Sequence, residues 1–233
     1  MLTLAAIKPV AAMVAGLSSL AIAALLHGTG PDLAEPIMRQ VEIPGSATLL
    51  VAEHEVTRRE WLACVADGAC EALTQELPQG AADMPMTGVN HLDVEAYLRW
   101  LNAAAGRRYR LPSTEEWHAI AAELPAAPYK KLFDDPRLAW AADYGSMPRV
   151  SAVVRPSGAF GTFSNGVADL GGNVWEWTST CTLKGAETDR CPAYLAEGLH
   201  EAAVSIFVRD PASGGCAVGA PPANIGFRLV ADE

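Results

Sequence analysis

The sequence predicts an α+β domain that is rich in loops, with a small antiparallel sheet, about three helices and a separate N-terminal hydrophobic helix. Three observations lead to this class. Two segments carry helix-start signals and a third has helical periodicity, all in the first half of the chain. Short apolar runs separated by turn residues between positions 41 and 51 are typical of strands. After Leu124, prolines, glycines and isolated apolar runs predict long ordered loops around the sheet.

The first strands and the first helix are predicted between residues 41 and 66. Residues 41–45 and 47–51 indicate a strand, a turn and a second strand. Thr57 and Glu60 have the spacing of a capping box, in which each side chain binds the backbone amide of the other residue. A helix is therefore expected from this point to about Ala66.

The second and third helices are predicted from periodicity and from a second capping box. Residues 92–105 are expected to be helical because their apolar side chains fall on one face: Val94, Tyr97, Leu98 and Leu101. Ser113 to Glu116 form the capping box of the third helix, whose Trp117 and Ile120 are expected to face the core. We assign the capping carboxylates a structural role and none a catalytic one.

The first 27 residues are predicted to be a membrane anchor or a signal segment. Val10–Leu26 is an uncharged run at the short limit for a transmembrane helix. Lys8 precedes it, which favours a cytoplasmic N-terminus and a domain outside the membrane. Ala21–Ala23 satisfies a small-x-small cleavage rule, but the apolar run continues beyond it. We therefore favour an uncleaved anchor over a cleaved signal.

The folded domain is predicted over residues 39–233, after a polar linker over 28–38. It is long enough for one hydrophobic core. The formal net charge of the chain is −10, which excludes the basic footprint of a nucleic-acid-binding protein. The same acidity argues against binding to anionic lipid headgroups. Any membrane contact is therefore expected from the N-terminal segment.

The cysteines favour an oxidising compartment. Four of the five flank two short loops as near neighbours, which predicts two disulfides: Cys64 with Cys70 and Cys181 with Cys191. The alternative is four free thiols in a cytosolic protein, which the hydrophobic N-terminus makes the poorer interpretation. Cys216 follows a turn at 213–215 and is a possible reactive thiol, with a buried, unreactive side chain as the alternative. The histidines lack ligand spacing, so no zinc or iron site is expected.

Residues 165–177, NGVADLGGNVWEW, concentrate glycine, tryptophan and polar side chains. The pair Gly171-Gly172 frees the backbone for close approach or positive φ. Asp169 and Glu176 offer carboxylate oxygens near free carbonyls, which a hard cation such as Ca²⁺ requires. The alternative is a glycine turn that leads into a tryptophan-bearing strand.

Three segments in a fixed order carry a family resemblance: RLPSTEEWHAIAA at 110–122, the segment at 165–177, and NIGFRLV at 224–230. Together they resemble the sulfatase-modifying, formylglycine-generating-enzyme family, whose domain is a variant of the C-type-lectin fold. The resemblance extends from about Val41 to Val230 and implies that fold. It does not imply the activity, because one fold hosts many functions.

The resemblance also implies a structural metal site. In the family, a loop that matches residues 169–176 binds Ca²⁺. The ligands carried over to this chain are side-chain oxygens of Asp169 and Glu176 and main-chain carbonyls of Gly172 and Val174. An empty or water-filled loop is the alternative.

The copper chemistry of the family is not expected here. Its enzymes hold copper with two cysteine thiolates shortly after an Arg-Gly-Gly-Ser-Trp segment. The matching stretch at 194–203 lacks that segment, and no cysteine pair follows it. Cys216 alone cannot form a two-thiolate Cu(I) site. Arg209 and Arg228 match family arginines, and we expect both to make structural ion pairs.

We therefore expect a non-catalytic accessory or binding subunit rather than an enzyme. It would be a single-pass protein of the bacterial inner membrane, with its domain in the periplasm and bound to a membrane protein complex or a periplasmic protein. The alternative function is a metal-dependent oxidoreductase of the same family that acts on a periplasmic substrate. Alternatively, the N-terminal signal is cleaved and the protein is soluble, either secreted or in the periplasm. Polysaccharide binding through Ca²⁺ is less expected, because protein ligands would fill the coordination shell of the ion.

Overall fold

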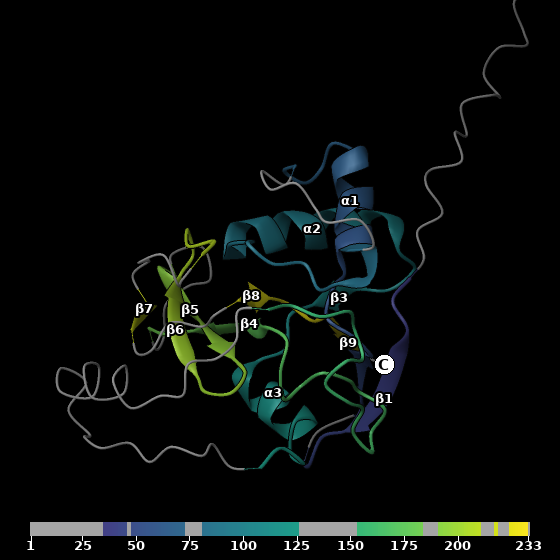
Figure 1. Cartoon of the computed structure of the whole chain (residues 1–233), viewed down its shortest axis with the longest axis vertical. Coiled ribbons are helices and arrows are strands. Elements are labelled where there is room, and N and C mark those ends of the chain that lie inside the picture. Colours follow the sequence, from purple (N-terminus) through teal and green to yellow (C-terminus); the bar gives the residue numbers. More distant parts are fainter. Residues whose placement is uncertain are drawn as a thin grey trace, which may run out of the picture. The chain divides into compact units, whose positions relative to one another are not determined.

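A computed structural model describes seven stretches of the chain, residues 35–45, 48–72, 81–125, 153–183, 191–210, 217–218 and 224–232 (Figure 1). The predicted anchor at the N-terminus and Cys216 lie outside these stretches. None of the helices within them has the length and hydropathy of a membrane span.

The helices form where the local sequence signals place them. They are α1 at Arg58–Ala66, the short 3₁₀ helix η1 at Ala81–Asp83, α2 at His91–Ala104 and α3 at Thr114–Ile120. The capping boxes predicted at Thr57 and Ser113 are both confirmed. A third box, which the sequence analysis missed, starts α2 with Asn90 and Asp93 in place of a hydroxyl residue and a glutamate.

The strands form two sheets rather than one. The first has the order β1-β2-β9-β3, with β1 at Met38–Glu42, β2 at Thr48–Ala52, β3 at Tyr109–Arg110 and β9 at Val230–Asp232. The second has the order β7-β6-β5-β4-β8, with β4 at Trp175–Cys181, β5 at Ala193–Glu197, β6 at Ala202–Ser205, β7 at Ala217–Val218 and β8 at Ile225–Gly226. All pairs are antiparallel except β4 with β8. The predicted first strand begins earlier than expected, at Met38, and ends at Glu42 because a turn at 44–45 follows it.

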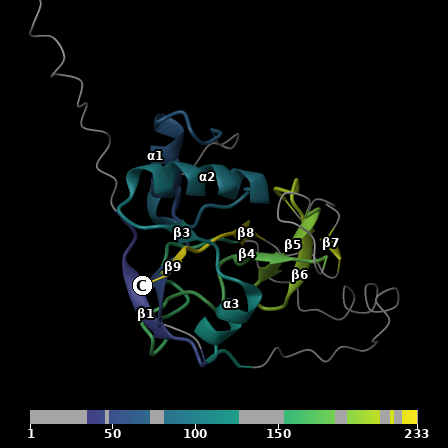
Figure 2. The same ribbon diagram turned by 180° about the vertical axis from the view of Figure 1, so that it is seen from behind.

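The core lies between the helices and the sheets. Figures 1 and 2 show α1 and α2 on one side of β3 and β9, and α3 on the other. The main cluster joins α1 and α2 to the C-terminal strands, and its centre is an aromatic group in which Trp61 stacks on Tyr97 while Phe227 meets both rings edge-on. A second cluster packs Trp117 and Ile120 of α3 against β1 and β2. The prediction that these two side chains face the core is therefore confirmed.

Both predicted disulfides are confirmed. Cys64 and Cys70 close the turn after α1, with their Cα atoms 5.3 Å apart, and Cys181 and Cys191 close the loop between β4 and β5, with a Cα separation of 5.9 Å. The second bridge joins the end of β4 to the start of the segment that leads into β5.

Candidate functional site

The residues at 165–177 run from a tight loop into β4. Asp169 and Asn173 both have positive φ, 65° and 66°, a conformation that these two residue types tolerate better than most. Gly172 is required for a different reason. A Cβ at this position would lie 2.7 Å from Cγ of Phe160, so only glycine lets the Phe160 ring approach the backbone so closely.

Asp169 organises the neighbouring loop. Its side chain is fully buried, and its Oδ1 accepts a hydrogen bond from the Phe160 amide at 2.8 Å. Its Oδ2 accepts a second hydrogen bond from the Gly158 amide. A buried carboxylate that accepts two backbone N–H groups in this way fixes the 158–160 turn against the motif.

Glu176 and Arg228 form a buried ion pair. Both are at most 1% exposed, and Arg228 donates from Nη2 to Oε1 of Glu176 at 2.7 Å. Trp117 donates to Oε2 at 2.9 Å. The Nε of Arg228 also donates to the Glu176 carboxylate, while Nη1 donates to the main-chain oxygens of Ala52 and Glu53 and Nη2 to that of Ala168. The ion pair expected for Arg228 is therefore confirmed.

Arg228 keeps its charge although it is buried. Burial alone would lower its pKa, but the carboxylates of Glu176 and Glu55 outweigh this effect, so the pKa of Arg228 is raised. The pair joins β2, the 168 loop and β4 at one point. Removing one partner would leave an uncompensated buried charge, which typically costs about 3–5 kcal/mol.

Glu55 is a third buried carboxyl beside this pair, and the sequence analysis missed it. It is 1% exposed, and neither of its side-chain oxygens has a hydrogen-bond partner. Burial raises the pKa of Glu55 to about 8; Arg228 opposes the shift, and Glu176 and Asp169 add to it. Glu55 is therefore largely protonated at neutral pH. No sequence motif marks it, because its burial depends on the packing of distant segments.

Of the four predicted calcium ligands, Asp169, Gly172 and Glu176 have their oxygens engaged by protein donors. Both oxygens of Glu176 bind Arg228 or Trp117, those of Asp169 accept backbone amides, and the carbonyl of Gly172 accepts the amide of Val174. Within the described stretches, no group of three or more His, Cys, Asp or Glu side chains is placed to hold a metal ion. In this arrangement a bound Ca²⁺ would have to share the Glu176 carboxylate with Arg228. Calcium stays a prediction.

Arg209 also makes the structural ion pair that was expected. Its Nε and Nη2 donate to the two oxygens of Asp93, each at 2.8 Å, and Nη2 also pairs with Glu71. Asp93 is the N3 residue of the capping box of α2, so Arg209 ties the loop after β6 to the start of that helix. The reactivity of Cys216 stays a prediction, because this residue lies outside the described stretches.

Another buried carboxyl group lies on β5, opposite Glu176. Glu197 is paired with Glu176 in the β4–β5 register, and its Oε2 lies 3.2 Å from Nε2 of His118. Burial raises the pKa of Glu197 to about 7, and His118 counters the shift. The two acidic side chains on adjacent strands thus have separate partners, Arg228 for Glu176 and His118 for Glu197.

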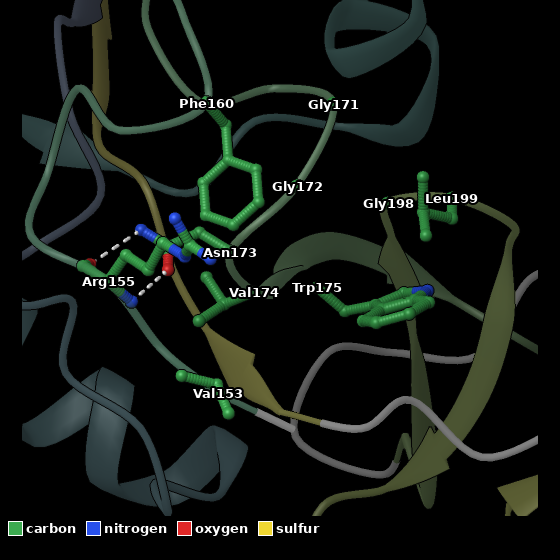
Figure 3. Close-up of a pocket in the computed structure, with 10 residues that line it drawn as sticks. All are labelled: Val153, Arg155, Phe160, Gly171, Gly172, Asn173, Val174, Trp175, Gly198 and Leu199. Carbon is green, nitrogen blue, oxygen red and sulfur yellow. Dashed lines mark hydrogen bonds between the residues drawn. The ribbon is translucent and has the colours of Figure 1, made fainter. Parts of the chain in front are cut away.

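A cavity of about 260 Å³ opens beside Trp175, and its lining residues come from the loop at 153–160, the motif at 171–175 and the end of β5 (Figure 3). Exposed apolar side chains gather on its rim: Val153 is 64% exposed, Phe160 42% and Leu199 40%. Trp175 is buried and donates its indole N–H to the carbonyl of His200 at 2.9 Å. The cavity is therefore largely apolar and accessible from outside.

Among the residues that the structure describes, Arg155 is the only charged one that lines this cavity. The Asn173 side chain holds its backbone by accepting from the Arg155 amide at 2.9 Å and donating to its carbonyl at 3.1 Å (Figure 3). The sequence analysis missed the cavity. Only the motif residues on one wall carried a signal, while the 153–160 loop and Leu199 carried none.

Comparisons with known proteins place this chain in a family. A model of the sulfatase-modifying factor enzyme 1-like domain matches residues 27–233. Hercynine oxygenase of Mycobacterium tuberculosis is 29% identical over 106 residues, which are 42% of this chain and 22% of that protein. The chain thus spans less than a quarter of the length of this curated relative.

Comparison with solved structures finds similar chains at low identity, and one of them reaches a TM-score of 0.50. The variable protein 1 of Treponema denticola has a TM-score of 0.50 at 16% identity and covers 84% of this chain and 95% of its own. PvdO of Pseudomonas aeruginosa has a TM-score of 0.49 at 21% identity and covers 84% of this chain and 91% of its own. Because the family model matches nearly the whole chain, the chain belongs to the family of the sulfatase-modifying factor enzyme 1-like domain.

Proposed function

We propose that this chain is a non-catalytic binding subunit that uses the cavity beside Trp175 to bind a partner protein. In this proposal its N-terminal segment anchors it in the bacterial inner membrane, and its domain lies in the periplasm as part of a larger membrane protein complex. The observation that carries the proposal is the gathering of Val153, Phe160 and Leu199 around one accessible cavity. Covering exposed apolar surface is a main driving force of protein association.

The distribution of cysteines and arginines supports a binding role over copper catalysis. Four of the five cysteines are consumed in two disulfides, which leaves Cys216 as the single thiol in a family whose enzymes use a pair. The two arginines that match the family pattern, Arg209 and Arg228, are engaged in ion pairs with Asp93 and Glu176. The disulfides also support an oxidising compartment such as the periplasm.

The test is purification of the intact chain from detergent-solubilised membranes, with the stoichiometry of any complex read by native mass spectrometry. We expect a complex of fixed ratio. Phe160→Ala should weaken it about tenfold or more, because truncating an anchor residue of an interface costs more than about 1 kcal/mol. Phe207→Ala is the matched control, since Phe207 is 70% exposed and does not line the cavity. A lone monomer, or a complex insensitive to Phe160→Ala, would contradict the proposal.

A second candidate function is that of a metal-dependent oxidoreductase acting on a periplasmic substrate. The similarity to hercynine oxygenase, an enzyme by name, favours it. Metal content and thiol titration of the purified chain distinguish the two candidates. Stoichiometric copper that is lost in Cys216→Ser would support the oxidoreductase and exclude a purely non-catalytic role.

A further inference from the structure

We propose that the cavity beside Trp175 takes one large apolar side chain of a peptide ligand, and that Arg155 pairs with a carboxylate next to that side chain. This inference rests on the proposed binding function of the same cavity. It specifies the chemistry of the ligand, which carries an apolar side chain and a carboxylate next to it.

The size of the cavity fits a side chain better than a whole small molecule. At about 260 Å³, it lies below the roughly 300–1,000 Å³ of pockets that enclose drug-sized ligands. Its walls are apolar, and the rim residues Val153, Phe160 and Leu199 remain exposed. A single anchor side chain inserted between them would fill the space and cover the rim.

Most polar side-chain groups around the cavity are already used within the protein. The amide of Asn173 is engaged on both sides by the backbone of Arg155, and the indole N–H of Trp175 binds the carbonyl of His200. Neither group is left to select a polar ligand. The charge of Arg155 is therefore the main polar feature that a ligand would meet.

Arg155 has an unused charge. It is exposed, and within the described stretches no ion pair joins its guanidinium to a carboxylate. None of the other lining residues in the described part of the chain is charged, although the whole chain carries a net charge of −10. A guanidinium presents parallel N–H donors that match the two oxygens of a carboxylate. Charge complementarity therefore favours an acidic group on the ligand.

The cavity is also formed in advance of binding. A Cβ at Gly198 would lie 2.9 Å from Cδ1 of Trp175, and one at Gly172 would lie 2.7 Å from Cγ of Phe160. The two glycines thus let the Phe160 and Trp175 rings pack directly on the backbone. The hydrogen bonds of Asn173 hold the backbone of Arg155 beside them. Such preorganisation reduces the entropy that binding costs.

The test compares two small ligands that differ by one charge. N-acetylphenylalanine carries a carboxylate next to its aromatic side chain, and N-acetylphenylalanine amide does not. Each is titrated into the full chain in zwitterionic lipid nanodiscs, and the indole ¹⁵N–¹H signal of Trp175 is followed, assigned through Trp175→Phe. We expect both ligands to shift this signal and the acid to bind about two- to fivefold more tightly, the range of an exposed ion pair.

Variants of two arginines complete the test. Arg155→Gln should remove the preference for the acid and leave the affinity for the amide unchanged. Arg99→Gln, whose parent side chain is 71% exposed and does not line the cavity, should keep the preference. Equal affinities of acid and amide for the unaltered chain would overturn this inference and leave the proposed binding function intact. If neither ligand shifts Trp175, the inference is also overturned, and the Phe160→Ala capture experiment then decides separately on the proposed function.

Discussion

Replacing Glu55 with glutamine should make this protein less sensitive to alkaline pH. Glu55 is 1% exposed, has no hydrogen-bond partner for either oxygen, and has a pKa raised by burial from 4.5 to about 8. In the unfolded chain its carboxyl ionises near the ordinary value. Between these two values the folded state holds a proton that the unfolded state has released. The contribution of Glu55 to stability is therefore fully present below pH 4.5 and is lost as the pH rises toward 8.

The size of the effect follows from the width of this pH window. Each pH unit between the two pKa values removes about 1.4 kcal/mol of unfolding free energy. From pH 4.5 to pH 7 the loss through Glu55 is therefore roughly 3 kcal/mol, a large part of the about 5–15 kcal/mol that stabilises a typical domain. Glutamine has nearly the shape of the protonated acid and does not ionise. Glu55→Gln should match the unaltered protein near pH 4.5 and exceed its stability by about this amount at neutral pH.

The difference is measured by urea unfolding at several pH values between 4.5 and 8. Tryptophan fluorescence reports the unfolding, and the disulfides are kept intact. Glu197, with a pKa of about 7, and His91, whose pKa burial lowers to about 4, also contribute to the pH dependence of both proteins. They are common to both, so the difference between the two curves isolates Glu55. Glu115→Gln removes an exposed carboxylate on α3 and is the control. A difference that stays constant across the range would refute the reasoning.

Three further predictions concern the rest of the site. Arg228→Met should lower the unfolding free energy by about 3–5 kcal/mol, because Glu176 would be buried without its partner; adding Glu176→Gln should restore part of the loss in urea unfolding. Replacing Cys181 and Cys191 with serine should cost about 2–3 kcal/mol, since the bridge closes a loop with a sequence separation of 10, and equal urea midpoints would contradict this. The calcium predicted from the sequence requires the melting temperature to fall in excess chelator, and unchanged melting would rule it out.

The parts of the fold that could be predicted from the sequence are those determined locally. Thr57 with Glu60 and Ser113 with Glu116 satisfy helix N-termini within a few residues, so their spacing alone located α1 and α3. The cysteine pairs were predictable for the same reason, because each closes a short loop. The resemblance to the family supplied the fold class, whereas the division of the strands into two sheets was not predicted.

The site could be predicted only in part, because its contacts join distant segments. Glu176 was recognised from its motif, but its partner Arg228 lies 52 positions further on, and Trp117 lies 59 positions earlier. The sequence showed oxygen atoms suited to a cation and could not show that a guanidinium binds them. The burial of Glu55 and the position of Arg155 beside Asn173 likewise depend on packing, and no spacing in the sequence indicates them.

The different roles of Trp175, Glu176 and Trp177 on β4 explain why family membership does not decide the function. Trp177 is fully buried and binds the carbonyl of Val89 at 3.0 Å, and Glu176 binds Arg228. Both residues therefore hold the scaffold together, whichever ligand the protein binds. Trp175 alone faces the cavity, and the groups that give the cavity its chemistry lie on loops outside the motif at 153–160 and 198–199. The same scaffold can thus keep its recognisable motif while the flanking loops change its ligand. Variants of Arg155 and Phe160 are therefore informative about function, whereas variants of Glu176 report on stability.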